Sequence, residues 1–150
     1  VDGAMPPRAL ELFVASYQGR LAALDSRTGR KLWQQNVSSV TGTNVGFGNV
    51  YVADVDGTLS AFLRTGQGVR WQNIELGYRE LSRPTPVSSY VATVDFEGYL
   101  HLLSQVDGQI VGRSKIGGDA ARADMIADSG RLIIYADNGQ LLAYELEAQD

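Results

Sequence analysis

The sequence predicts an all-β protein, a β-propeller of four antiparallel blades. Four apolar runs each reverse at a polar residue followed by glycine, and these glycines lie 38, 41 and 41 residues apart. They are Gly19, Gly57, Gly98 and Gly139. Repeats of about forty residues that contain hairpins are typical of propellers, in which each repeat forms one blade. The strands before these turns are apolar on both faces, and a second glycine turn leads from the hairpin into a further strand.

Each blade is expected to begin with a short innermost strand, close to the axis of the ring. The four segments are about 5–9, 43–47, 85–88 and 124–127. The next two strands form the hairpin, and we expect two-residue turns with positive φ at both positions, which a polar residue and glycine supply most easily. These turns are Gln18-Gly19, Asp56-Gly57, Glu97-Gly98 and Asn138-Gly139.

The first strand of each hairpin should be covered on both sides. Its apolar runs are 12–15, 50–53, 90–94 and 132–136. A half-exposed strand would alternate apolar and polar residues instead. Apolar side chains on both faces therefore indicate blades that stack face to face around a common axis.

The outer strand of each blade follows a Thr-Gly or Asp-Gly turn. Trp33 and Trp71 lie on the first two outer strands, but the third repeat has Gly112 or Arg113 in the place of tryptophan. The fourth blade lacks an outer strand, because residues 147–150 are too few to form one. The blades are expected at about 4–37, 42–75, 85–116 and 123–147.

The chain is expected to be part of a larger ring. Residues 1–8 contain Pro6 and Pro7, and proline is a poor member of a paired strand, so closure of a four-bladed ring by this segment is unconvincing. If the half ring is stable by itself, a second copy would cover its exposed edges.

Composition excludes several classes of function. The 150 residues carry a formal charge of −4, which speaks against a nucleic-acid partner. No window is long and apolar enough to span a bilayer. The absence of cysteine excludes disulfides and thiolate metal sites.

The residues do not predict a catalytic set, a metal or a cofactor. His101 is the only histidine and lies in a strand between Leu100 and Leu102, which favours a partly buried structural residue over a catalytic base. The segment Asp54-Val55-Asp56-Gly57 has the start of a calcium loop, but the glutamate that such a loop needs at its end is missing. The same segment fits the hairpin turn found in all four repeats.

The segment from Gly19 to Trp33 resembles the repeat of the pyrroloquinoline-quinone-dehydrogenase type of propeller. In such repeats the tryptophan packs against the neighbouring blade. Among these families the chain is similar to BamB, the lipoproteins of the outer-membrane β-barrel assembly complex. Segments 53–57, 81–87 and 95–101 carry this resemblance. It implies an eight-bladed ring, of which this chain would be the C-terminal half, without the lipobox cysteine.

The resemblance implies a non-enzymatic scaffold on the periplasmic face of the bacterial outer membrane. BamB proteins bind the periplasmic (POTRA) domains of BamA and assist the insertion of outer-membrane proteins, so those domains and unfolded outer-membrane proteins are the expected partners. Family contacts lie in loops that connect blades, which points to Asp2 and to loop charges at 77–84 and 117–123. The loop residues are Arg79, Glu80, Arg83 and Arg122. The competing interpretation is that these charges are simply solvated.

Two alternative functions stay open. One is a quinone-dependent dehydrogenase, because the repeat is shared with those enzymes, although no segment resembles their cofactor-binding parts. The other is a propeller that binds another protein or a glycan through some of its seven tyrosines and two tryptophans, most of which are expected to be buried.

Overall fold

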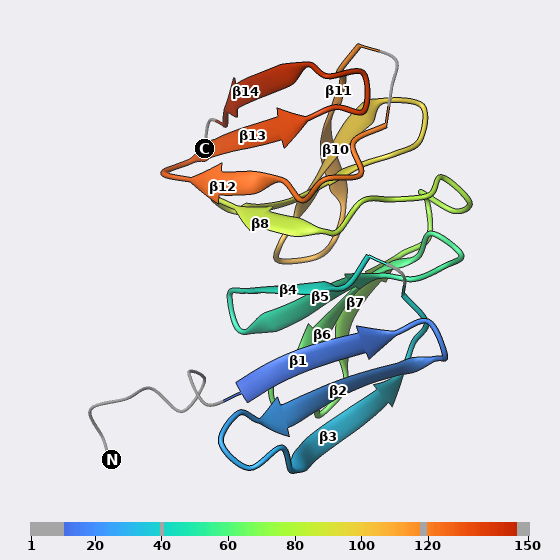
Figure 1. The fold of residues 1–150 in the computed structure, drawn as a ribbon, viewed down its shortest axis with the longest axis vertical. Coiled ribbons are helices and arrows are strands. Elements are labelled where there is room, and N and C mark those ends of the chain that lie inside the picture. The colour runs from blue at the N-terminus through green and yellow to red at the C-terminus, as the bar shows by residue number, and fades with distance from the viewer. Residues whose placement is uncertain (1–10, 40, 118–119, 147–150) are drawn as a thin grey trace.

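A computed structural model describes residues 11–39, 41–117 and 120–146. These residues form four antiparallel sheets and contain no helix. The first sheet lies lowest in Figure 1 and the second above it, while the third and fourth lie side by side in the upper half. No element of this described part is a helix long and apolar enough to cross a membrane. The predicted all-β propeller architecture is confirmed.

The four sheets are simple meanders, in which each strand pairs with the next one along the chain. The first sheet contains β1 (Glu11–Ser16), β2 (Arg20–Asp25) and β3 (Lys31–Asn36). The second contains β4 (Thr43–Gly46), β5 (Asn49–Ala53), β6 (Leu59–Leu63) and β7 (Val69–Asn73). The third contains β8 (Thr85–Val87), β9 (Tyr90–Val94), β10 (Tyr99–Ser104) and β11 (Ile110–Lys115). The fourth contains β12 (Ile126–Asp128), β13 (Arg131–Tyr135) and β14 (Leu141–Glu145).

The innermost strands of successive sheets lie next to one another. β8 contacts both β4 and β12, while β4 also contacts β1. This is the arrangement expected of blades around a common centre. The innermost strand predicted at about 5–9 for the first sheet lies outside the described residues.

The predicted two-residue turns at the four repeated glycines are wrong in type. Only the glycine of each pair has positive φ, for example +87° at Gly57, and Asp56 does not. Gly57 N donates to Asp54 O and Asp54 N donates to Thr58 O, so the loop has three residues and ends with a left-handed glycine. Two-residue turns with positive φ at both positions occur instead after the innermost strands, at Phe47-Gly48 and Ser129-Gly130.

Burial distinguishes the two middle sheets from the two outer ones. All five residues of β5 and all five of β9 are buried, as the apolar pattern predicts. In β1, however, Leu12 and Val14 are exposed, and in β13 Tyr135 is exposed. The expectation that every such strand is covered on both faces is therefore wrong for β1 and β13, because each outer sheet has a described neighbour on one side only.

Three apolar clusters fill the spaces between the sheets, and two of them are closed by a tryptophan. Trp33 Nε1 donates to Arg64 O of the second sheet at 3.0 Å, and Trp71 Nε1 donates to Gln105 O of the third at 2.9 Å. Each indole lies on a glycine of the receiving turn, where an added Cβ would come within 2.3 Å of the ring at Gly66 or Gly108. Glycine is thus required at both turns by close packing as well as by positive φ.

In the third sheet, the large and the small residue of one cross-strand pair have exchanged places. Trp33 and Trp71 pair across the sheet with Ala23 and Ala61, whereas the corresponding pair in the third sheet is Gly112 with Leu102. A Cβ at Gly112 would lie 3.4 Å from Leu102 Cδ1. Leu102 on β10 therefore fills the volume near the position that the indole occupies in the other two sheets.

Candidate functional site

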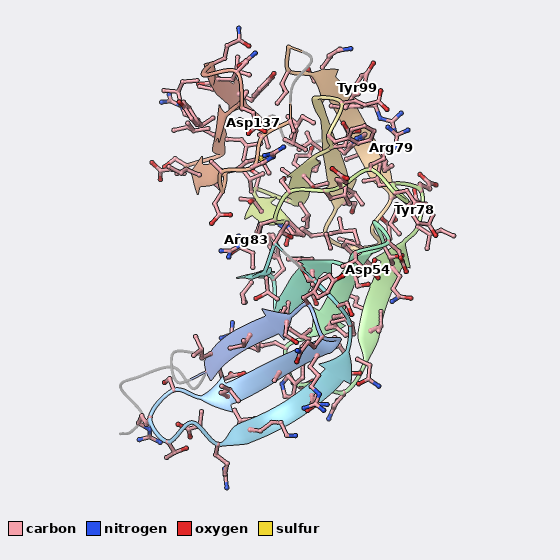
Figure 2. The ribbon with its side chains drawn as sticks, turned by 45° about the vertical axis from the view of Figure 1, so that its right-hand side comes forward. Asp54, Tyr78, Arg79, Arg83, Tyr99 and Asp137 are labelled. Carbon is pink, nitrogen blue, oxygen red and sulfur yellow. The ribbon has the colours of Figure 1, made fainter. Side chains whose placement is uncertain are left out.

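One end of the molecule, called the loop end from here on, collects the connections between sheets and the turns between the second and third strands. A backbone hydrogen bond joins each connection to the turn of the sheet that it enters. Val55 N donates to Ser38 O at 3.0 Å, Phe96 N to Arg79 O at 2.9 Å, and Asp137 N to Ala120 O at 2.8 Å. These repeated bonds hold three connections and three turns together as one surface. Figure 2 labels Asp54, Arg79, Arg83 and Asp137 on it.

A cavity of about 660 Å³, called the loop-end pocket, opens on this surface. Its lining comes from the second, third and fourth sheets and includes Val55, Leu81, Phe96 and Ala121. The charged lining residues are Asp54, Glu80, Arg122 and Asp137. Two of the residues predicted to bind a partner, Glu80 and Arg122, thus lie in one pocket.

Arg79 begins a chain of polar contacts that runs into the third sheet. Its Nη1 lies 3.1 Å from Asp95 Oδ2, and His101 Nε2 lies 2.8 Å from the same oxygen. Arg113 Nε donates to His101 Nδ1 at 3.1 Å. Since Nδ1 accepts this bond, the proton of the neutral imidazole is on Nε2 and points to Asp95. Asp95 and His101 are completely buried.

The surroundings of this buried pair shift the pKa of both groups. Burial raises the pKa of the Asp95 carboxyl, but hydrogen bonds from His101 and from the Tyr99 and Glu97 amides outweigh it and hold that pKa below its ordinary 3.8. Burial lowers the pKa of His101 below its ordinary 6.5, although Asp95 opposes this shift. A neutral, enclosed histidine whose two ring nitrogens are both engaged is a structural group, and no substrate atom can reach it without a change in the fold.

The other two predicted arginines are also held by acidic neighbours. Arg83 Nη1 lies 3.4 Å from Asp124 Oδ2, and its Nε donates to Thr41 O at 2.8 Å. Arg122 Nε lies 3.2 Å from Asp137 Oδ2, and its backbone N–H donates to the same carboxylate. All three arginines therefore brace the loop end internally.

Glu80 differs from these arginines. Its carboxylate makes no hydrogen bond or ion pair within the described part of the chain, and its backbone has φ of +50°. Asp2, the remaining predicted partner residue, lies outside the described residues.

The acidic segment at Asp54 forms a turn. Asp54 Oδ1 accepts the backbone N–H groups of Asp56 and Thr58 at 2.9 and 3.1 Å. Asp95 Oδ1 accepts those of Glu97 and Tyr99 in the same way. No group of three or more metal-ligating side chains occurs among the residues that the structure describes.

Sequence reasoning missed the exposed apolar side chains of the loop end. Tyr78 is 82% exposed, Val55 48% and Phe96 47%. The expectation that most tyrosines are buried holds for Tyr51 and Tyr90 but is wrong for Tyr78 and for two others, Tyr17 and Tyr135. The repeat offers one signal: Val55, Phe96 and Asp137 occupy the same position of three successive turns, where side chains point away from the sheets.

Several known proteins that resemble this chain are BamB proteins. A family model described as the outer membrane protein assembly factor BamB matches residues 2–73. The assembly factor BamB of Pseudomonas aeruginosa is 46% identical over 122 residues, which cover 81% of this chain and 32% of that protein. The crystal structure of BamB from Moraxella catarrhalis matches with a TM-score of 0.83 at 30% identity, over 91% of this chain and 40% of that one.

The chain belongs to the BamB family. It spans about a third of the length of the curated BamB relatives that it matches, for example 32% of the proteins from Pseudomonas aeruginosa and Marinobacter adhaerens. The quinohemoprotein alcohol dehydrogenase of Comamonas testosteroni shares the fold alone, with a TM-score of 0.68 at 16% identity. The repeat common to both therefore reports architecture, and function must come from the site.

Proposed function

We propose that this chain is part of a non-enzymatic accessory subunit of the outer-membrane β-barrel assembly complex, and that its loop end binds the periplasmic domains of BamA. The main support is the gathering of three connections and three turns, bonded to one another, around a single pocket. Loops held by a rigid scaffold are the usual place for binding in such folds. The relatives are named as outer membrane protein assembly factors.

The chemistry of the described side chains supports binding over catalysis. The only histidine is buried and has both ring nitrogens engaged. General acid–base catalysis needs a group within hydrogen-bond reach of the substrate, and this histidine does not offer one. No observation favours the quinone-dependent or glycan-binding alternative over this proposal.

The location and further partners belong to the same proposal. The complete protein would act at the periplasmic face of the outer membrane, held there by a lipid anchor, and unfolded outer-membrane proteins would be further partners. The exposed faces of β1 and β13 would be covered by neighbouring blades of a larger ring, or by a second copy where the half ring stands alone.

The experiment is a titration of purified BamA periplasmic domains with the complete protein and with this chain. The test variants are Arg122→Glu, at the loop end, and Asp2→Lys. Arg27→Glu is the matched control, because Arg27 is exposed in the β2–β3 turn at the opposite end of the molecule. We expect binding to the complete protein, weakened by the two test variants and unchanged by the control. No binding to the complete protein would refute the proposed function.

A further inference from the structure

We propose that the loop-end pocket binds an extended protein segment in which a basic side chain lies next to an apolar one. This inference deepens the proposed function, because it takes the loop end as a protein-binding surface and specifies the chemistry of its partner. Part of the pocket lining is apolar, and two carboxylates in the pocket form no ion pair within the described residues.

About half of the pocket lining is apolar, and this apolar part crosses three sheets. Leu81 and Ala121 are buried, while Val55 and Phe96 stand about half exposed. Tyr78 lies three residues before Leu81 and is the most exposed aromatic residue of the loop end. Aromatic side chains beside an apolar cleft are the usual anchors of protein interfaces, since their burial supplies much of the binding energy.

The charge of the lining is negative. Arg122 and Asp137 neutralise each other at 3.2 Å, which leaves Asp54 and Glu80. Neither carboxylate forms an ion pair with any cation in the ranges that the structure describes. An occupant with a lysine or arginine would complement this charge.

A comparison of two equivalent aspartates shows why Asp54 matters. Asp95 in the third sheet and Asp54 in the second each cap their turn through Oδ1. Asp95 Oδ2 is then occupied by Arg79 and His101. No hydrogen bond within the described residues reaches Asp54 Oδ2, because Ser60 stands where the third sheet has His101 and instead accepts from Gln72. The second sheet therefore keeps an acceptor that the third sheet uses internally.

The connection that carries Glu80 is anchored through Arg79. Tyr78 and Glu80 have φ of +59° and +50°, on either side of Arg79. Arg79 is fixed by its side chain to Asp95 and by its carbonyl to Phe96 N. The anchored residue, Arg79, therefore lies between Tyr78 and Glu80, whose side chains are exposed. A loop already held in its bound shape loses less entropy when a partner binds.

The test uses two synthetic peptides and this whole chain. One peptide alternates lysine with phenylalanine and leucine, and the other replaces every lysine with glutamate. Binding is measured by fluorescence anisotropy and mapped by the NMR shifts of backbone amides. We expect only the basic peptide to bind, with shifts at Val55, Phe96 and Ala121.

Each variant replaces one carboxylate with an uncharged amide side chain of the same shape. Asp54→Asn keeps an oxygen that can accept the turn N–H groups, and Glu80→Gln changes an exposed side chain. The matched control is Glu75→Gln, which removes the same charge from the same connection but does not line this pocket. We expect the double variant Asp54→Asn/Glu80→Gln to lose about tenfold in affinity, and the control to bind as the unmodified chain does. Phe96→Ser should weaken binding, whereas Phe47→Ser at the opposite end should not.

The outcomes separate this inference from the proposed function. Equal binding of both peptides, or unchanged affinity of the double variant, would overturn the inference. If BamA periplasmic domains bind the complete protein and its double variant equally, the proposed function stands and the inference fails. If the basic peptide binds in the pocket but those domains do not bind, the proposed function fails and the inference holds. Self-association abolished by the double variant would identify a second copy as the occupant, against the inference.

Discussion

The interface between the second and third sheets and the interface between the third and fourth are built from different kinds of contact. In the first, Trp71 is 7% exposed, donates to Gln105 O and rests on Gly108, while the neighbouring Asn73 donates to Gly108 O. In the second, the cluster is aliphatic, and Leu102 packs against it where a tryptophan would otherwise enter. Both interfaces bury apolar area, and in the first of them Trp71 and Asn73 also make directional bonds that fix how one sheet meets the next.

The largest expected effect is that of removing the buried indole. Trp71→Ala should lower the free energy of unfolding by about 3–5 kcal/mol, because it removes a large packed side chain and leaves Gln105 O without its donor. Urea denaturation followed by circular dichroism measures this loss. Trp71→Phe separates ring volume from the hydrogen bond. A loss below about 1 kcal/mol for Trp71→Ala would mean that the two interfaces are held in the same way.

A smaller effect is expected from the glycine on which the indole rests. Gly108→Ala places a methyl group within 2.3 Å of the Trp71 ring, in addition to the cost of φ at +76°. Gly29→Ala is the matched control, since Gly29 has φ of +73° in the equivalent turn of the first sheet and no atom within 4 Å of its added Cβ. Both variants should lower the free energy of unfolding by about 1–2 kcal/mol, because alanine is strained in the left-handed backbone conformation. Gly108→Ala should cost about 1–3 kcal/mol more from overpacking, measured by thermal denaturation. Equal losses would show that the contact with the indole is not tight.

The reversed pair in the third sheet can be tested by exchange. Gly112→Trp alone should destabilise the fold, because Leu102 already fills the adjacent space. Combined with Leu102→Ala, it reproduces the pairing of Trp71 with Ala61 and should recover about 1 kcal/mol relative to the sum of the single changes. A double-mutant cycle in urea gives this coupling. Strict additivity would show that the two positions do not share one volume.

The smallest expected effect is a dependence of stability on pH that is specific to the third sheet. The pKa of His101 is lowered by burial, so the unfolded chain binds its proton more readily than the folded one. The contribution of neutral His101 to the free energy of unfolding is complete above about pH 6.5 and is lost as the pH falls. For one proton, the free energy of unfolding falls by less than about 1.4 kcal/mol per pH unit. The pKa of Asp95 is also lowered, so the protein loses further stability when the pH falls below 3.8, the ordinary pKa of this carboxyl.

His101→Gln keeps a donor for Asp95 and an acceptor for Arg113 but does not titrate. Unfolding free energies measured between pH 7.5 and 5 should therefore fall less in this variant than in the unmodified chain. Parallel curves for the two proteins would exclude His101 as the titrating group.

Much of the architecture could be predicted from the repeat, because hairpins at a constant period leave few alternatives. The turn type could not be predicted from glycine alone, since both kinds of loop accept a polar residue before glycine. An aspartate side chain three residues before the glycine caps the turn N–H groups at Asp54 and Asp95, but it does not decide the turn type. Ser16 and Ala136 stand at that position in the other two turns, and the same backbone bond forms there. The exposed faces of β1 and β13 were also missed, because an apolar pattern indicates a neighbour without showing where that neighbour lies.

The candidate site could be predicted only in outline. Its loops and four of its charges follow from the repeat and from the family resemblance. The partners of those charges do not, because Arg79 meets Asp95 and Arg122 meets Asp137 only once each connection has crossed to the next sheet. The exposed Tyr78 and Phe96 have no signal in composition, since an aromatic residue in a loop is equally compatible with burial.

The direction of the tryptophan contacts has a consequence for the order in which the sheets can cover one another. The Trp33 indole donates to a carbonyl 31 residues further along the chain, and the Trp71 indole donates to one 34 residues further along. The indole of the first sheet and that of the second therefore stay uncovered until the next sheet along the chain has packed against them. A chain that ended after the first or the second sheet would therefore expose one indole, whereas one that ended after the third sheet, which has no tryptophan, would expose none.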